Sequence, residues 1–133
     1  MNRAGQPGIV LVSHSAAIAD GLSAMAAEVA GGEVRVMGAG GGPDGTLGTD
    51  GARVAEAIRA ADAGAGVVVL ADIGSAVLSV RAVLAEGQLD GAAVLADAPL
   101  VEGAIAAAVT ASTGAGLDAV RAAAEDAWNV RKL

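Results

Sequence analysis

Four continuous runs of apolar residues divide the chain, each rich in Val, Ile or Leu and bounded by Gly, Asp or Pro. They lie at about residues 8 to 13, 33 to 38, 66 to 71 and 92 to 97. Short apolar runs without polar alternation are typical of strands that are covered on both faces of a parallel sheet. The pattern therefore predicts four strands of this kind.

Ala-rich stretches with helical character alternate with these strands and follow the last one. They predict helices at about residues 16 to 30, 50 to 63, 75 to 86, 99 to 112 and 117 to 128. Residues suited to helix ends support the boundaries, namely Thr49 or Asp50 before the second helix, Gly31 and Gly32 after the first, and Pro99 in the first turn of the fourth. The alternation predicts a small doubly wound, three-layer α/β domain, with a mainly parallel four-stranded sheet and helices on both faces.

The order of the strands follows from the handedness of their connections. Right-handed crossovers with helices on both faces favour the order 2-1-3-4, in which the winding reverses between strands 1 and 3. Ligands bind at such a switch point, beyond the carboxyl ends of the strands. His14 ends the first strand and Asp72 ends the third, so we expect the two side chains to face each other.

Composition narrows the class of protein. A chain of 133 residues is one domain, with an ordered core expected at about residues 8 to 128. Apolar residues make up 54% of the chain but aromatic residues only 1%, so the core must consist of small, closely packed side chains. The absence of Cys excludes disulfides and thiol chemistry. With no long apolar span and no signal-peptide pattern, a cytoplasmic protein is expected.

The charge balance bears on the partners. There are 15 acidic and 8 basic residues, for a net charge of -7, which disfavours nucleic acids and anionic lipids. A bound phosphate would therefore be held by backbone amides and hydroxyl groups. A partner protein with a basic docking face is compatible with this charge.

His14 is the only histidine of the chain and the main candidate for reactive chemistry. An imidazole with a pKa near 6.5 is largely neutral at neutral pH, and its free nitrogen can attack phosphorus. Asp72 is placed to accept the ring N–H and thereby select the tautomer. If Asp72 pairs with the nearer ring nitrogen, Nε2 remains free. The alternative is a packed histidine beside a carboxylate that only caps a helix. No metal site is predicted.

Donors for a transferred phosphoryl group are expected at the starts of the helices. The candidates are the hydroxyl groups and first-turn amides near His14 and Asp72, together with the turn before the second helix: Ser13, Ser15, Gly48, Thr49, Gly74 and Ser75. Helix caps use the same residue types and the same geometry, so each candidate also has a purely structural interpretation.

Two further segments are interpreted without a catalytic role. Residues 38 to 45 contain the dinucleotide-type spacing Gly40, Gly42, Gly45, but Pro43 interrupts it and the helix begins too late, so a flexible loop is predicted. The fourth helix is apolar nearly all round, which suggests that part of it lies in a subunit interface. Its Glu102 suits the first turn of a helix.

Several segments together carry a resemblance to a known family: residues 9 to 15, Gly48-Thr49-Asp50, residues 72 to 76, and residues 98 to 103. Over about residues 8 to 128 the chain resembles the phosphotransferase subunit of the phosphoenolpyruvate-dependent dihydroxyacetone kinases, which are relatives of the mannose-type IIA domains of the sugar phosphotransferase system. Ile73 stands where that family often has Met, and the loop at residues 38 to 45 is unusually rich in glycine.

The resemblance implies that His14 accepts phosphate from the carrier protein HPr and passes it to ADP held on the nucleotide-binding subunit of the kinase. No cofactor would then be bound by this chain. It implies a homodimer, with Asp72 paired to the imidazole and with Gly48, Thr49, Gly74 and Ser75 lining the phosphate site. Two alternatives remain: a IIA domain that passes phosphate to the IIB domain of a mannose-class transporter, and a non-catalytic nucleotide-binding or regulatory module.

Overall fold

A computed structural model describes residues 5–133. The strands are β1 (Gly8–Ser13), β2 (Val36–Gly40), β3 (Val67–Ala71) and β4 (Ala93–Leu95). The helices are α1 (Ala16–Val29), α2 (Gly51–Ala61), α3 (Gly74–Ala85), α4 (Leu100–Ser112) and α5 (Leu117–Asp126), and a 3-10 turn follows at Ala127–Asn129. Every predicted element is present in the predicted order.

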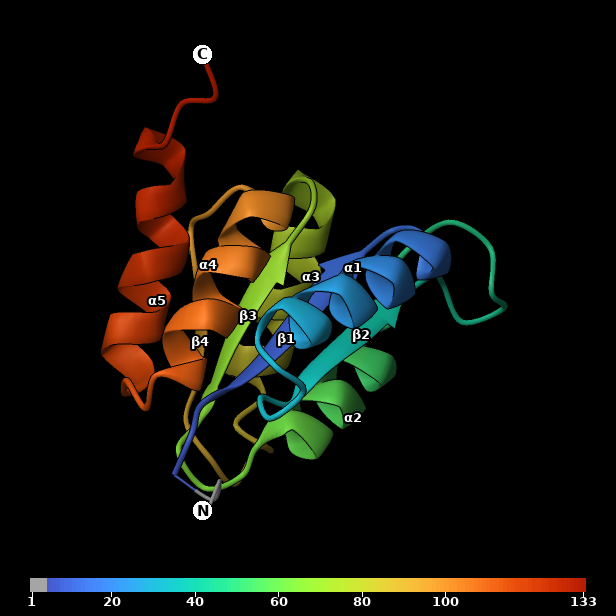
Figure 1. The fold of residues 1–133 in the computed structure, drawn as a ribbon. Coiled ribbons are helices and arrows are strands. Elements are labelled where there is room, and N and C mark those ends of the chain that lie inside the picture. The colour runs from blue at the N-terminus through green and yellow to red at the C-terminus, as the bar shows by residue number, and fades with distance from the viewer. Residues whose placement is uncertain (1–4) are drawn as a thin grey trace.

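The four strands form one sheet in the order β2-β1-β3-β4, and every neighbouring pair is parallel. Both the predicted order and the predicted α/β class are confirmed. Figure 1 shows α1, α4 and α5 on the near side of the sheet, and α2 and α3 behind it. The carboxyl ends of β1 and β3 therefore lie side by side, at the switch point of the winding.

The bounds predicted for the second strand were wrong. That strand begins at Val36 instead of residue 33 and continues to Gly40, opposite Ser13 of β1. Its last residues include Gly38 and Gly40, which an apolar-run criterion passes over because glycine has no side chain to bury. A Cβ added at Gly40 would lie 2.6 Å from the Ser15 carbonyl oxygen. Glycine therefore allows α1 to lie directly against β2.

The helix ends largely follow the sequence prediction. Asp50 is the N-cap of α2 and accepts a hydrogen bond from the Ala52 amide at 3.0 Å. Gly31 and Gly32 follow α1 with φ of 86° and 80°, in the left-handed region that favours glycine. Pro99 is the N-cap of α4, one residue before the predicted position.

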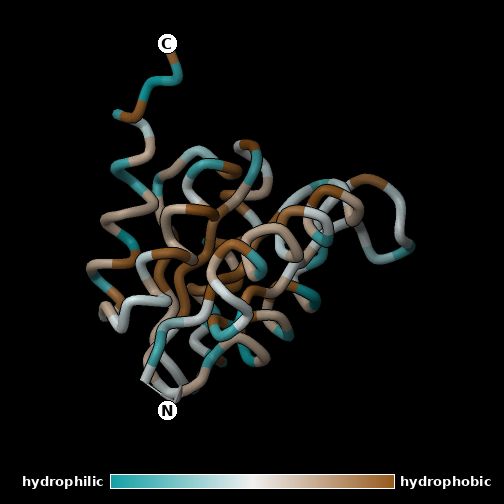
Figure 2. The backbone as a smooth tube through the Cα atoms, in the orientation of Figure 1, coloured by the Kyte–Doolittle hydropathy of each residue, from teal (hydrophilic) through white to brown (hydrophobic). Residues whose placement is uncertain are grey.

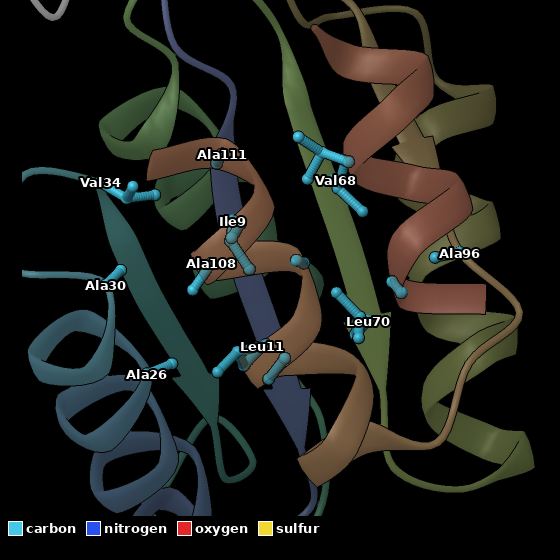
Figure 3. Packing of buried hydrophobic residues seen from close by; sticks show 14 of the residues in the cluster. Ile9, Leu11, Ala26, Ala30, Val34, Val68, Leu70, Ala96, Ala108 and Ala111 are labelled. Atoms are coloured by element: carbon cyan, nitrogen blue, oxygen red, sulfur yellow. The ribbon is translucent and has the colours of Figure 1, made fainter. Parts of the chain in front are cut away.

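Two hydrophobic cores lie on opposite faces of the sheet because alternate strand residues point to opposite sides. Ile9 and Leu11 of β1 face α1, α4 and α5, whereas Val10 and Val12 face α2 and α3. Figure 3 shows the first core, in which Ala108 and Ala111 of α4 lie over the strands. Figure 2 shows that the hydrophobic residues, coloured brown, are concentrated in the centre of the molecule, where the strands lie. The buried residues of the two cores are all Ala, Val, Leu or Ile, as the composition predicts.

The small apolar residues of α4 are buried within one chain. Its buried residues face the sheet, and α1 and α5 pack along its sides. Val101 and Val109 of the same helix stay exposed, at 48% and 41%, so a subunit interface on α4 stays a prediction. In the first turn of α4, Glu102 accepts a hydrogen bond from Lys132 at 2.7 Å, which ties the C-terminal segment to the start of the helix. Among residues 5–133, no helix is long and apolar enough to cross a bilayer.

Candidate phosphotransfer site

The site lies where β1 and β3 end next to each other. Val12 pairs with Ala71 in the parallel register, and the Asp72 amide donates to the Val12 carbonyl at 3.1 Å. The residues that follow, His14 and Asp72, are therefore brought to the same edge of the sheet although 58 positions separate them. Each then leads into a helix start, α1 or α3.

Asp72 contacts His14 at two points. Its Oδ1 lies 3.0 Å from His14 Nδ1, and its Oδ2 accepts a hydrogen bond from the His14 backbone amide at 3.0 Å. A carboxylate accepts hydrogen bonds only, so this contact selects the tautomer with the proton on Nδ1. The lone pair then resides on Nε2. The juxtaposition predicted from the strand order is present.

Ser13 lies behind this pair and is fully buried. Its hydroxyl donates to Asp72 Oδ2 at 2.9 Å and accepts a hydrogen bond from the Ser15 amide at 3.1 Å. The proton of that hydroxyl is therefore directed at the carboxylate and away from the site opening. The Ser13 hydroxyl orients Asp72 in this structure, and a phosphate contact by Ser13 stays a prediction.

The ionised form of Asp72 is stabilised by its surroundings. Burial by itself raises the pKa of this carboxyl, but hydrogen bonds from the His14 amide and ring, the Ser13 hydroxyl and the Ile73 amide outweigh it, so the pKa of Asp72 is lowered. The Ile73 amide contributes a bond of 2.8 Å. A carboxylate that stays ionised is suited to stabilise positive charge on the neighbouring imidazole.

The Nε2 side of His14 is open. The His14 side chain is 23% exposed, and Nε2 lies 2.5 Å from Ser75 Oγ in the first turn of α3. With Nδ1 protonated, the Ser75 hydroxyl is the donor in this contact. The Gly74 and Ser75 amides lie in the first turn of α3, where amides have no acceptor within the helix, and both residues are exposed. Of the predicted phosphate donors, Ser75 is thus in direct contact with the reactive nitrogen, and Gly74 precedes it in the same turn.

Ser15 caps α1. Its side chain accepts a hydrogen bond from the Ile18 amide at 3.3 Å, which leaves the hydroxyl proton of Ser15 without an assigned acceptor. Asp72, by contrast, is not the N-cap of α3, because Ile73 takes that position and makes no side-chain cap. The purely structural interpretation of Asp72 as a cap therefore does not describe this carboxylate.

The loop between β2 and α2 approaches the site from the other side. The Gly48 amide donates to the His14 carbonyl at 3.0 Å, and Thr49 Oγ1 lies 2.7 Å from Ser79 Oγ of α3. Sequence reasoning missed Ser79, because a serine inside a helix carries no local signal of a distant partner. Before these two contacts the loop forms its own turn, in which the Gly42 amide donates to the Thr46 carbonyl at 2.7 Å.

A cavity of about 450 Å³ adjoins the site. It shares Asp72 and Gly74 with the site and extends past Arg81 to Trp128. Within residues 5–133, no group of three acidic, His or Cys side chains is arranged to hold a metal ion. The chemistry that this edge of the sheet offers is that of an oriented imidazole with hydroxyl and amide donors.

Comparison with protein-family models identifies a match over most of the chain. Residues 8–121 match the EIIA-man family, described as the PTS system fructose IIA component. The matched range includes β1, the turn that carries His14, and the turn that carries Asp72.

Curated relatives match over a similar range. A protein of Listeria innocua named the phosphoryl donor subunit DhaM of PEP-dependent dihydroxyacetone kinase 2 is 39% identical over 114 residues, covering 84% of this chain and 91% of that protein. The phosphoryl donor subunit DhaM of Providencia stuartii is 37% identical over 130 residues, covering 94% of this chain but 27% of that protein. The chain thus spans about a quarter of that longer relative.

Solved structures agree on the architecture. A crystal structure of a protein of unknown function superposes with a TM-score of 0.79 at 38% identity, covering 91% of this chain and 94% of that chain. A sigma-54 interaction domain protein from Enterococcus faecalis superposes with a TM-score of 0.63 at 17% identity and shows the fold alone. Since the family model matches most of the chain and the Listeria relative is covered nearly end to end, the chain belongs to the EIIA-man family.

Proposed function

We propose that this chain is the phosphoryl donor subunit of a PEP-dependent dihydroxyacetone kinase, the function named for its Listeria and Providencia relatives. In this proposal His14 takes a phosphoryl group from phospho-HPr and passes it to ADP on the nucleotide-binding subunit of the kinase. The observation that carries it is the imidazole held at Nδ1 by Asp72, 3.0 Å away, with Nε2 toward the opening.

The first transfer needs no proton to leave His14. The Nε2 lone pair forms a bond to phosphorus, the phosphorus–nitrogen bond of the donor's phosphohistidine breaks, and that electron pair returns to the donor's ring. The His14 ring becomes positively charged while Nδ1 keeps its proton. The ionised Asp72 beside Nδ1 stabilises this charge, which supports its assignment as the residue that orients the imidazole.

The Ser75 hydroxyl must change partner during this step. In the resting site it donates to Nε2 at 2.5 Å, on the side where phosphorus bonds. When Nε2 bonds to phosphorus its lone pair is no longer available, so the hydroxyl turns to a phosphoryl oxygen. The amides of Gly74 and Ser75 at the start of α3 supply further donors.

The second transfer reverses the bond changes at His14. A terminal oxygen of the ADP diphosphate attacks phosphorus, the bond to Nε2 breaks, and the electron pair returns to the ring. The nucleotide belongs to the partner subunit in this proposal, so this chain contributes the imidazole, its carboxylate and the donors at α3. We place the protein in the cytoplasm, where both partners are expected.

A homodimer is also part of the proposal. Its support is the resemblance to the family, together with Val101 and Val109 of α4, which are exposed. Light scattering coupled to size exclusion measures the state directly: a mass near 25 kDa, twice that of the 12.6 kDa chain, supports the dimer. A mass that stays at one chain across the concentration range rejects it.

The relay is tested by reconstitution. The protein is incubated with phosphoenolpyruvate, enzyme I and HPr, and is then offered either the ADP-loaded kinase subunit or a IIB domain. Acid-labile label on His14 that moves to ADP supports the proposal. Label that moves only to the IIB domain instead assigns the chain to a mannose-class transporter. Tight nucleotide binding without any label on His14 points to a regulatory module.

A further inference from the structure

Three segments around His14 are joined by a closed ring of hydrogen bonds. The Gly48 amide donates to the His14 carbonyl at 3.0 Å, and the next residue, Thr49, meets Ser79 at 2.7 Å. Ser79 Oγ donates to the Ser75 carbonyl at 3.1 Å, and Ser75 Oγ returns to His14 Nε2. The ring therefore connects the turn before α1, the loop before α2 and the first turn of α3.

The direction of the bonds in this ring follows from counting protons. A serine hydroxyl has one proton, and the Ser75 carbonyl can only accept, so the proton of Ser79 is directed at that carbonyl. The 2.7 Å contact between Thr49 and Ser79 must then use the proton of Thr49. Both hydroxyl protons are assigned to bonds within the ring, and none remains on Thr49 for a phosphoryl oxygen.

The ring acts on the donor that is nearest to the reactive nitrogen. Ser79 is one helical turn after Ser75. The Ser79 hydroxyl donates to the Ser75 carbonyl, and the Ser75 side chain contacts His14 Nε2. Ser79 is half-buried beside Thr49, whereas residues 43 to 47 of the loop are exposed. Gly48 has a φ of 145°, a conformation that favours glycine. The contact between Thr49 and Ser79 directly follows this glycine and connects the loop to α3.

We infer that Ser79 is a positioning residue, which with Thr49 fixes the glycine-rich loop and the Ser75 turn relative to Nε2, and that the Thr49 hydroxyl serves this link and does not bind phosphate. The inference rests on the proposed phosphotransfer at His14. It revises the sequence-based assignment of Thr49 to the phosphate site.

The test compares Thr49→Val and Ser79→Ala, singly and together, with Ser23→Ala as the matched control. Ser23 makes the same type of bond, from its hydroxyl to the Ala19 carbonyl four residues back at 2.8 Å, but makes no contact with the site residues. Each site variant should slow phosphorylation of His14 roughly three- to tenfold, the effect of losing a net hydrogen bond or slightly more. The double variant should be no slower than the slower single variant, because both break the same link.

A second readout is independent of turnover. Since His14 is the only histidine, the imidazole ¹⁵N resonances of the labelled protein report this residue alone. Thr49→Val and Ser79→Ala should shift the Nε2 resonance in the same direction, and Ser23→Ala should leave it unchanged. Ser79→Thr, which keeps the hydroxyl, should restore both the rate and the resonance. A general loss of stability would not produce this pattern.

Two results would overturn the inference. In the first, Thr49→Val is much slower than Ser79→Ala and the two effects multiply in the double variant, which means that Thr49 itself binds the phosphoryl group. Alternatively, Ser79→Ala matches Ser23→Ala in rate and resonance, and Ser79 then has no positioning role. Failure of the wild-type protein to become phosphorylated would reject the proposed function instead, and the ¹⁵N comparison would still decide whether the link positions the imidazole.

Discussion

Asp72 holds both the ring and the backbone of His14: one carboxylate oxygen lies 3.0 Å from Nδ1 and the other 3.0 Å from the backbone nitrogen. The carboxylate thus fixes the tautomer and the position of the ring together. Ser13 supports it from the buried side, at 2.9 Å. An imidazole held in this way presents the same nitrogen to every partner, which a relay between two proteins requires.

Replacement of His14 by Ala should abolish phosphorylation while the protein stays folded. The ring is partly exposed and belongs to neither hydrophobic core, so its removal leaves the packing intact. Acid-labile phosphate is measured after incubation with phosphoenolpyruvate, enzyme I and HPr, and circular dichroism serves as the folding control. Label retained in the variant would place the phosphorylation elsewhere.

Asp72→Asn should slow phosphorylation of His14 by roughly a factor of 100 or more, as expected when the group that orients a catalytic imidazole is lost. The amide keeps the size of the side chain but carries no charge to stabilise the imidazolium. Its nitrogen can also favour the wrong tautomer. Rapid-quench measurement of the single-turnover rate tests this, with Asp97→Asn as a control, since Asp97 uses only backbone atoms in its hydrogen bonds. An unchanged rate would reduce Asp72 to a structural role.

The same carboxylate should make stability depend on acid pH. Because its pKa is lowered in the folded state, its contribution is fully present above the ordinary carboxyl value of about 3.9 and is lost as the pH falls through the lowered value. The midpoint of urea unfolding should therefore decrease more between pH 6 and pH 3 for the wild type than for Asp72→Asn. Asp44 and Glu102 also have lowered pKa values, but both proteins contain them, so their effect cancels. Equal losses would contradict the assignment.

Ser75→Ala should lower the rate of phosphorylation roughly 10- to 100-fold, the range for losing one hydrogen bond to a charged group. The variant removes the hydroxyl that contacts Nε2 at 2.5 Å, while the first-turn amides of α3 remain. Ser75→Thr should retain most of the activity because it keeps the hydroxyl. If Ser75→Ala matches the wild type, the amides alone hold the phosphoryl group.

The close contact between α1 and β2 can be tested through two glycines. A Cβ at Gly38 would lie 2.8 Å from the Ala19 carbonyl oxygen, so Gly38→Ala should lower the free energy of unfolding by about 1–3 kcal/mol. A Cβ at Gly21, within α1, would meet nothing within 4 Å, so Gly21→Ala should raise it by about 0.4–1 kcal/mol. Urea denaturation measures both. The same sign for both variants would contradict the packing described for this helix.

The candidate site was only partly predictable from the chain. The pairing of His14 with Asp72 followed from strand order, since parallel neighbours end at the same edge of a sheet. The partners of the hydroxyl groups did not follow. Ser13, Ser75 and Thr49 all looked like phosphate donors, yet their protons are directed at Asp72, His14 and Ser79 respectively. A short hydroxyl side chain has several acceptors within reach, and a helix shift of about 1 Å changes which one it meets.

By itself the sequence determined the alternation of strands and helices, the parallel sheet and the reactive pair at its switch point, because these depend on hydrophobic periodicity and on the handedness of crossovers. Only the tertiary structure decided that β2 extends through Gly38 and Gly40, that α1 and α5 pack against α4, and that Ser79 links the loop to α3. These features depend on how closely two elements approach, and that distance is set by the packing of all the layers together.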